Sequence, residues 1–250
     1  MRKKGTMFYS ALLLTGANLA LRMVSMGFQV YLSGRIGAAG IGLMQLVLSV
    51  STLAMTAAMA GVRTSAMYLT AEEIGRGHGA VGQVRDTCFV YSLCFSCLMA
   101  LGVYLFAPAI AEGWIGDRQT VAALRVFALF LPVVCLVGVM TGCFTAAGRI
   151  RELVVTELLE QGVCMALTVA LLANWAHHDP GRSCTAVVAG SSLSSALTLG
   201  ILLTLWYRRR SAEEEKREPM VRRLLQVALP LAVADDLRMG INTVENLIVP

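Results

Sequence analysis

The most constraining feature of the sequence is a series of long stretches that contain no charged residue. They cover residues 36–62, 87–111, 126–148 and 183–207. Each is long enough for a helix to cross the roughly 30 Å hydrocarbon core of a bilayer, which takes about 20 apolar residues. None alternates in the way a membrane β-strand does, and an open strand could not satisfy its backbone in lipid. The sequence therefore predicts an integral membrane protein built from helices.

Three further apolar segments carry a few charges. Residues 6–33 are interrupted only by Arg22, residues 161–176 extend backward over two glutamates, and residues 224–250 hold several acids. Short polar connections make neighbouring helices antiparallel. We therefore expect an all-α membrane protein with a six-helix transmembrane bundle (residues 1–207), a charged cytoplasmic linker (208–223) and a seventh transmembrane helix (224–250) that opens a second, missing lobe.

The distribution of Lys and Arg predicts the orientation of these helices, because basic residues collect on the cytoplasmic side of membrane proteins. With the N-terminus in the cytoplasm, the outer loops hold four of them, Arg35, Arg118, Arg125 and Arg182. The inner side then holds fifteen: Arg2, Lys3, Lys4, Arg63, Arg76, Arg85, Arg149, Arg151, Arg208, Arg209, Arg210, Lys216, Arg217, Arg222 and Arg223. We expect a multi-pass protein of the cytoplasmic membrane with a cytoplasmic N-terminus, in contact with membrane lipids.

Several short motifs lack the context that their chemistry needs. The net charge of +5 comes largely from residues between apolar blocks, so it favours membrane topology over nucleic-acid binding. Residues 77–82 match GxGxxG without a βαβ unit, and residues 94–97 match CxxC inside an apolar stretch. Most of the seven cysteines lie in such stretches, which argues against a disulfide framework. We expect no enzyme activity, cofactor or bound metal.

Polar residues recur on single faces of four predicted helices. At 100° per residue, Asn18, Arg22 and Gln29 lie within about 40° of one another. Polar groups inside a membrane usually face the bundle interior or a cavity, and Ser and Thr there usually hydrogen-bond to a neighbouring helix. The other faces, in arcs of about 60° to 100°, hold Gln45, Ser49, Thr52, Thr56 and Arg63; Glu157, Gln161, Cys164 and Thr168; and Asp235, Arg238, Asn242, Glu245 and Asn246.

Two glycines and one arginine carry specific expectations. Gly138 and Gly142 form a GxxxG motif, which is typical of closely packed helices. Arg22 lies in the middle of its predicted span, where an unpaired arginine costs about 3 kcal/mol. It is explained by an ion pair inside the bundle or by an anionic ligand, and both stay open. Asp235 or Glu245 could supply the ion pair, or Asp235 could pair instead with Arg238.

Several segments, in order along the chain, resemble one superfamily of exporters. Residues 37–45 (GAAGIGLMQ) look like its glycine-rich turn before the second helix, and residues 61–65 (GVRTS) resemble the end of that helix. Residues 142–150 (GCFTAAGRI), 157–161 (ELLEQ) and 244–250 (VENLIVP) are similar to later turns and helix ends. This is the multidrug/oligosaccharidyl-lipid/polysaccharide exporter superfamily, in its polysaccharide-biosynthesis and stage V sporulation protein B-like branch.

The resemblance implies two helical lobes around a central cavity that opens alternately to either side. It implies a flippase for a lipid-linked anionic sugar or cell-envelope precursor, with the second lobe in the same chain or in a second subunit. Arg22 corresponds in position to the first of several arginines in the related lipid II flippases, whose next two positions fall at Phe28 and Thr56 here. These two departures argue against lipid II as the cargo, and a different polyprenyl-pyrophosphate sugar remains compatible with the resemblance.

A pyrophosphate group crossing the membrane needs fixed positive charge and hydrogen-bond donors. The candidate substrate-binding residues are Arg22, Asn18, Gln29, Gln45 and Arg63. One alternative is a cation-coupled multidrug or metabolite exporter of the same superfamily. Its ion-coupling or intramembrane pairing residues would be Asp235, Asp236, Arg238 and Glu245. The other alternative is a scaffold or subunit that transports nothing and whose polar faces only pack.

Overall fold

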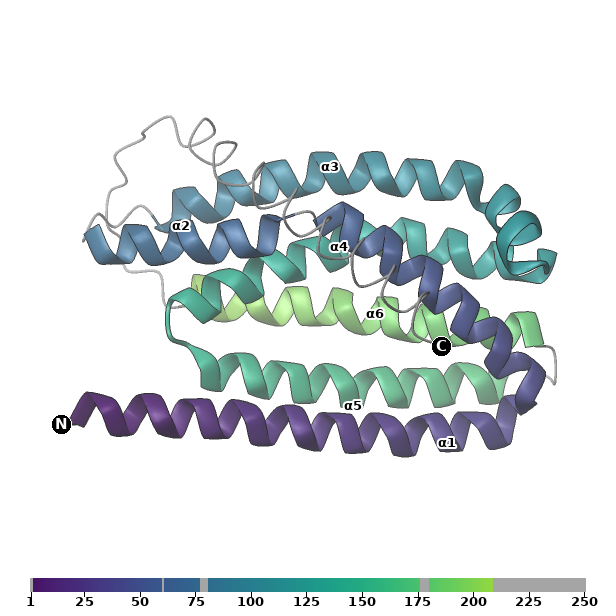
Figure 1. The fold of residues 1–250 in the computed structure, drawn as a ribbon, viewed down its shortest axis with the longest axis horizontal. Coiled ribbons are helices and arrows are strands. Elements are labelled where there is room, and N and C mark those ends of the chain that lie inside the picture. Colours follow the sequence, from purple (N-terminus) through teal and green to yellow (C-terminus); the bar gives the residue numbers. More distant parts are fainter. Residues whose placement is uncertain (1, 60, 77–80, 176–179, 209–250) are drawn as a thin grey trace, which may run out of the picture.

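The computed structural model of the chain describes residues 2–59, 61–76, 81–175 and 180–208. This part of the chain is an all-α bundle of long helices lying side by side, and it contains no strand (Figure 1). The elements in chain order are α1 (Arg2–Met59), α2 (Val62–Arg76), α3 (Val81–Ile110), the π-helical turn η1 (Ala111–Ile115), the 3-10 turn η2 (Arg118–Thr120), α4 (Val121–Ala146), α5 (Ile150–Trp175) and α6 (Pro180–Tyr207).

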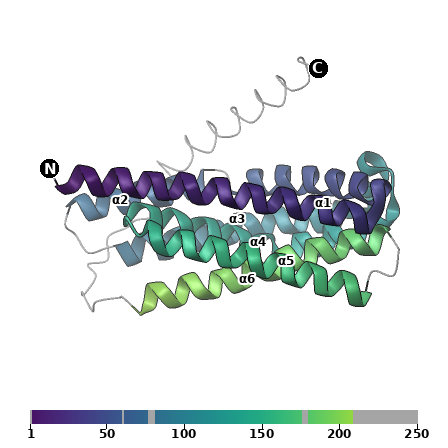
Figure 2. The ribbon, with the colours of Figure 1, turned by 90° about the horizontal axis from the view of Figure 1, so that it is seen from below.

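The helices confirm the predicted membrane bundle. Five helical stretches in the described residues are long and apolar enough to cross a bilayer: Gly40–Arg76, Val81–Gly113, Arg118–Ala146, Ile150–Asn174 and Gly181–Tyr207. The first predicted span, residues 6–33, lies in the first half of α1. That half runs along one edge of the bundle, and the end of α6 lies on the opposite edge (Figure 2). The predicted seventh helix, and the linker apart from Arg208, lie outside the described residues.

Two glycines divide the first 76 residues into three helical segments. Gly37 (φ 77°, ψ 170°) reverses the direction of the chain within α1, in the predicted glycine-rich turn (Figure 1). Gly61 (φ 67°) separates α1 from α2. Positive φ angles suit glycine because it has no Cβ to clash with the backbone. The break at Gly61 therefore lies at the end of the second predicted span, residues 36–62, and α2 has a first turn of its own.

α4 is the central helix of the bundle. It packs against α1, α2, α3, α5 and α6. Its buried side chains join several apolar clusters: Leu131 and Cys135 pack with Ala58 of α1, and Met140 and Phe144 pack with Leu202 of α6. Burial of these side chains holds the other helices around α4 and makes the bundle one packed unit.

The GxxxG motif lies where α4 crosses the break between α1 and α2, as predicted for close packing. A Cβ at Gly138 would lie 1.8 Å from Cε of Met59, and one at Gly142 would lie 2.6 Å from the backbone oxygen of Arg63. α5 approaches α6 in the same way, since a Cβ at Gly190 would lie 2.5 Å from Oγ1 of Thr168. At Gly142 the obstacle is backbone, so only glycine permits this approach without displacing a helix, whereas at Gly138 the flexible end of Met59 could move aside.

Candidate substrate-facing site

The first turn of α2 presents an arginine away from the core. Val62, Ser65 and Ala66 are buried on the packed side of α2, whereas Arg63 is exposed. The Arg63 guanidinium makes no direct hydrogen bond or ion pair with another described residue. Since Arg63 is 13 residues before the end of α2, it lies about 20 Å from that end. A charged group with free donors is thus placed well inside the length of the bundle.

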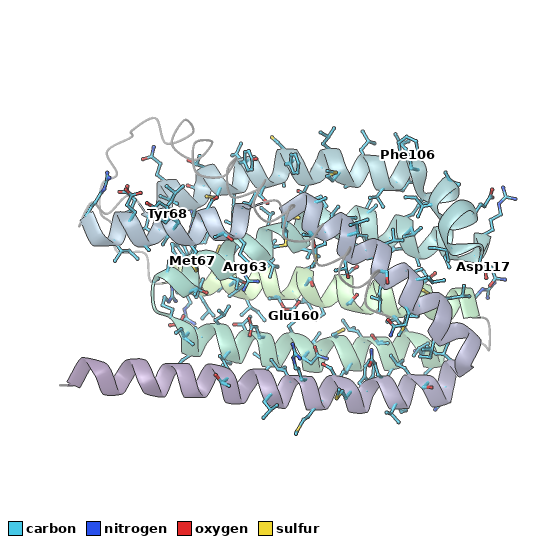
Figure 3. The ribbon with its side chains drawn as sticks, in the orientation of Figure 1. Arg63, Met67, Tyr68, Phe106, Asp117 and Glu160 are labelled. Atoms are coloured by element: carbon cyan, nitrogen blue, oxygen red, sulfur yellow. The ribbon has the colours of Figure 1, made fainter. Side chains whose placement is uncertain are left out.

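The nearest opposite charges come from α5. Glu157 is close enough to Arg63 for their charges to attract, and close enough to Glu160 for theirs to repel. Figure 3 places the labelled side chains of Arg63 and Glu160 in the region between α2 and α5. Glu157 and Glu160 follow Ile150 by about 10 and 15 Å along the helix axis. The three charges therefore form a cluster inside the bundle rather than at its ends.

Glu160 is held in place by α6. Its Oε1 accepts a hydrogen bond of 2.9 Å from Oγ of Ser195, and its backbone oxygen accepts one of 2.7 Å from Oγ of Ser194. The neighbouring Gln161 reaches the other way, because its Nε2 donates to Oγ of Ser25 on α1 at 3.2 Å. One turn of α5 thus connects α6 with the first half of α1. The bond from Ser195 fixes the orientation of the Glu160 carboxylate, whose charge acts on Glu157.

The other candidate residues lie mostly on exposed surfaces. Arg22, Gln29 and Gln45 are exposed, and Arg22 makes no ion pair within the described part of the chain. The side chain of Asn18 lies outside the described residues. So do Asp235, Asp236, Arg238 and Glu245, and with them the proposed pairing of Arg22 to the seventh helix.

The predicted polar face of the second span differs from the structure in two respects. The break at Gly61 means that Arg63 does not continue the helical phase of Gln45. The expectation that hydroxyls on this face bond to neighbouring helices is wrong for Ser49, Thr52 and Thr56. Each donates to the backbone oxygen four residues earlier, at 2.8 to 2.9 Å. Ser and Thr hydroxyls on a helix can bond in this way to the backbone of the preceding turn.

Glu160 is a site residue to which the sequence alone assigned no role. The sequence feature that could have indicated Glu160 is the pair of carboxylates within an otherwise apolar span. Placing two acids in a membrane costs free energy unless they have partners. Helical phase favoured only Glu157, because it shares a face with Gln161 and Thr168. Among the described residues, no group of three or more His, Cys, Asp or Glu side chains is placed to hold a metal ion.

The arrangement of the helices matches solved membrane transporters. A MATE protein in its straight conformation superposes with a TM-score of 0.66 at 18% identity, over 90% of this chain and 51% of that one. An outward-facing multidrug resistance MATE family transporter of the MOP superfamily gives 0.64 at 19% identity, with the same coverage. A MOP superfamily transporter from Pyrococcus furiosus gives 0.62 at 17% identity, again over 90% and 51%. The bundle has the fold of one lobe of a two-lobe transporter.

Sequence comparison identifies the family within that class. The family described as "Polysaccharide biosynthesis protein" matches residues 9–243, and the chain belongs to it. Stage V sporulation protein B of Bacillus subtilis (strain 168) is 27% identical over 168 residues, which are 66% of this chain and 32% of that protein. The chain thus spans about a third of this relative and about half of each solved transporter.

Proposed function

We propose that the chain is the first lobe of a flippase that moves a lipid-linked anionic sugar across the cytoplasmic membrane by alternating access. The substrate class is a polyprenyl-pyrophosphate oligosaccharide or a related cell-envelope precursor. Family membership and the one-lobe fold support a transporter of this superfamily. The observation that carries the substrate proposal concerns Arg63. Its side chain is exposed, lies away from the ends of the bundle and has no direct partner in the described residues.

Arg63 has the chemistry to hold a pyrophosphate group. A guanidinium binds two phosphate oxygens at once, and it stays charged at any physiological pH. Arg63 also lies on the first turn of α2, where the helix dipole favours an anion. Within the lobe, Arg63 attracts the carboxylate of Glu157 without a direct hydrogen bond or ion pair between them. An arriving phosphate would replace that long-range attraction with direct hydrogen bonds.

Exposed residues of α1 would complete the proposed substrate site. Arg22 would supply a second positive charge, and Gln29, Gln45 and Asn18 would hydrogen-bond the sugar or phosphate oxygens. The polyprenyl tail would remain in the bilayer while the polar group crosses between the lobes. This arrangement assumes a cytoplasmic N-terminus, as the distribution of Lys and Arg predicts.

A lipid-movement assay tests this proposal. The protein, with any partner it retains, is reconstituted into liposomes that carry a fluorescent polyprenyl-pyrophosphate sugar. Dithionite bleaches the outer leaflet and reports arrival of lipid from the inner one. We expect the protein to speed up movement of this lipid but not of the same sugar joined to the tail by a neutral ether. Equal movement of both lipids, or no acceleration, would refute the proposed substrate class.

Replacing Arg22 tests the exposed face of α1 separately. We expect Arg22→Ala to reach the membrane in normal amount and to lose lipid movement, because the pyrophosphate loses the positive charge that Arg22 would supply. The matched control is Arg35→Ala, which removes another exposed arginine of α1 and should keep wild-type movement. Wild-type movement by a stable Arg22→Ala protein would remove Arg22 from the site.

A cation-coupled exporter is the second candidate function, and the acidic pair Glu157 and Glu160 favours it. Two carboxylates inside an apolar helix are typical of proton or cation relays. On this view a proton or sodium gradient drives the export of a drug or metabolite. Gradient-driven efflux of an organic cation from the same liposomes, lost in Glu160→Gln, would support this function and contradict the flippase.

A further inference from the structure

Two arginines contact one tryptophan at one end of the bundle. At this end α2 ends, α3 begins and α6 ends, and we call it the α2–α3 end. Arg85 is on the second turn of α3 and has a side chain only 1% exposed. Its guanidinium lies 5.8 Å from the ring centre of Trp206 and 5.1 Å from that of Tyr207. Asp86, which is largely exposed, pairs with it at 2.5 Å. Arg85 thus connects α3 to the last turn of α6.

Arg149 approaches the same tryptophan from the turn between α4 and α5. Its guanidinium lies 6.0 Å from the ring centre of Trp206 and 4.3 Å from that of Phe144. Its Nη2 donates to the backbone oxygen of Leu205 at 3.1 Å and also pairs with Glu152. The two aromatic rings are themselves in contact, 5.5 Å apart between centres. Arg149 thus ties the α4–α5 turn to the same turn of α6.

The turn that carries Arg149 has a defined shape. Gly148 has a φ of 69°, and its backbone N–H donates to the oxygen of Thr145 at 3.1 Å. The next N–H, of Arg149, donates to the oxygen of Phe144 at 3.0 Å. This is a common way to end a helix with a left-handed glycine. It fixes the backbone from which the Arg149 side chain reaches Trp206.

Apolar packing would hold these helices together at least as well as buried arginines. Burying a guanidinium is costly, and an apolar replacement of similar size is often neutral or stabilising. A flat guanidinium over an indole ring instead restricts the direction in which the two groups approach. The Nη1 atom of Arg85 and the Nε atom of Arg149 are buried without a hydrogen-bond partner in the described part of the chain. The arrangement therefore favours a specific geometry over maximal stability.

α6 is the last helix in the described part of the chain, and residues 209–250 follow it in sequence. We propose that Arg85 and Arg149 are positioning residues that hold the last turn of α6 against α3 and the α4–α5 turn. They set the direction in which the chain leaves the lobe, and turnover of the transporter depends on that direction. The link to turnover rests on the proposed function, whereas the positioning of α6 does not.

A distance measurement tests the positioning. Exposed Val90 on α3 and Thr204 on α6 are each changed to cysteine and spin-labelled, in a protein whose exposed Cys94 and Cys97 are replaced by serine. We expect one narrow distance distribution by electron paramagnetic resonance. Arg85→Leu and Trp206→Ala should broaden it, while Trp206→Phe, which retains an aromatic ring, should keep it narrow. Distributions that stay narrow in both Arg85→Leu and Trp206→Ala would overturn the proposal.

Lipid movement in liposomes provides the readout that a merely structural role would not change. We expect Arg85→Leu to unfold at the same temperature as the wild type, to lower the maximal rate about tenfold and to leave KM unchanged, since no substrate contact is lost. A broadened distribution with a wild-type rate would refute the dependence of turnover on α6. The distance measurement needs no substrate, so its outcome is independent of whether the wild-type protein moves the polyprenyl lipid.

Discussion

Arg63→Ala will lower the rate of lipid movement roughly 10- to 100-fold at subsaturating substrate. The estimate follows from the loss of a charge-assisted hydrogen bond, about 1.5–3 kcal/mol, with each 1.4 kcal/mol equal to a factor of about ten. The side chain is exposed and outside the packed face of α2, so its removal should leave the unfolding temperature unchanged. The measurement is the initial rate of dithionite-accessible lipid against substrate concentration, together with a thermal melt.

Glu157→Gln separates substrate binding by Arg63 from internal pairing. If Arg63 binds the pyrophosphate, Glu157→Gln removes a negative charge that competes with the pyrophosphate for Arg63. Lipid movement should then stay at the wild-type rate or become faster. If Arg63 only balances Glu157, the two substitutions will reduce movement equally, and the substrate role is wrong. Arg118→Ala is the matched control. The Arg118 side chain is 85% exposed and lies in the turn before α4, far along the bundle from Arg63. The Arg118→Ala protein should therefore behave as wild type.

Gly142→Ala will destabilise the lobe by about 1–3 kcal/mol, the usual cost of overpacking a buried contact. The added Cβ would lie 2.6 Å from the backbone oxygen of Arg63 and 3.4 Å from Cβ of Ala66. The backbone oxygen of Arg63 cannot move away by a side-chain rotation, so α2 must shift as a unit. The measurement is the midpoint of thermal aggregation in detergent. Because the clash is with Arg63 itself, lipid movement should fall as well.

Gly162→Ala is the control for this substitution. Gly162 lies in the helical part of α5, and a Cβ there would meet nothing within 4 Å. Alanine also has a higher helix propensity than glycine, so the variant should melt at or slightly above the wild-type temperature. Equal melting of Gly142→Ala and the wild type would mean that α2 and α4 do not pack as closely as the structure shows.

The helical bundle was predictable because hydrocarbon permits few backbone solutions. Long charge-free stretches must be helices, and their positions matched α3, α4 and α6 closely. The glycine-rich turn at Gly37 and the close packing at Gly142 were also predictable, because each depends on the absence of a Cβ at a named residue. The helices extend beyond the charge-free stretches, since charged residues such as Arg76 and Arg85 are tolerated near helix ends.

The polar residues were harder to place because their positions depend on neighbours far away in the sequence. Arg85 and Arg149 were expected among the basic residues of the inner side, yet Arg85 is buried against Trp206. Helical phase selected Glu157 but not Glu160, whose partner Ser195 is 35 residues away. Helical periodicity predicted Arg63 on the same face as Gln45, but the helix is broken at Gly61, between these two residues.

The sequence by itself determined that this protein is a bundle of membrane helices, where its turns fall and that it resembles the exporters whose family it belongs to. Those properties follow from local composition, since burial in lipid acts on each apolar stretch independently. Only the tertiary structure decided which charges meet. It brought Arg63 near Glu157 and placed Arg85 and Arg149 on one tryptophan. A charge inside a membrane is stabilised by whatever lies beside it, and helix packing sets that neighbour.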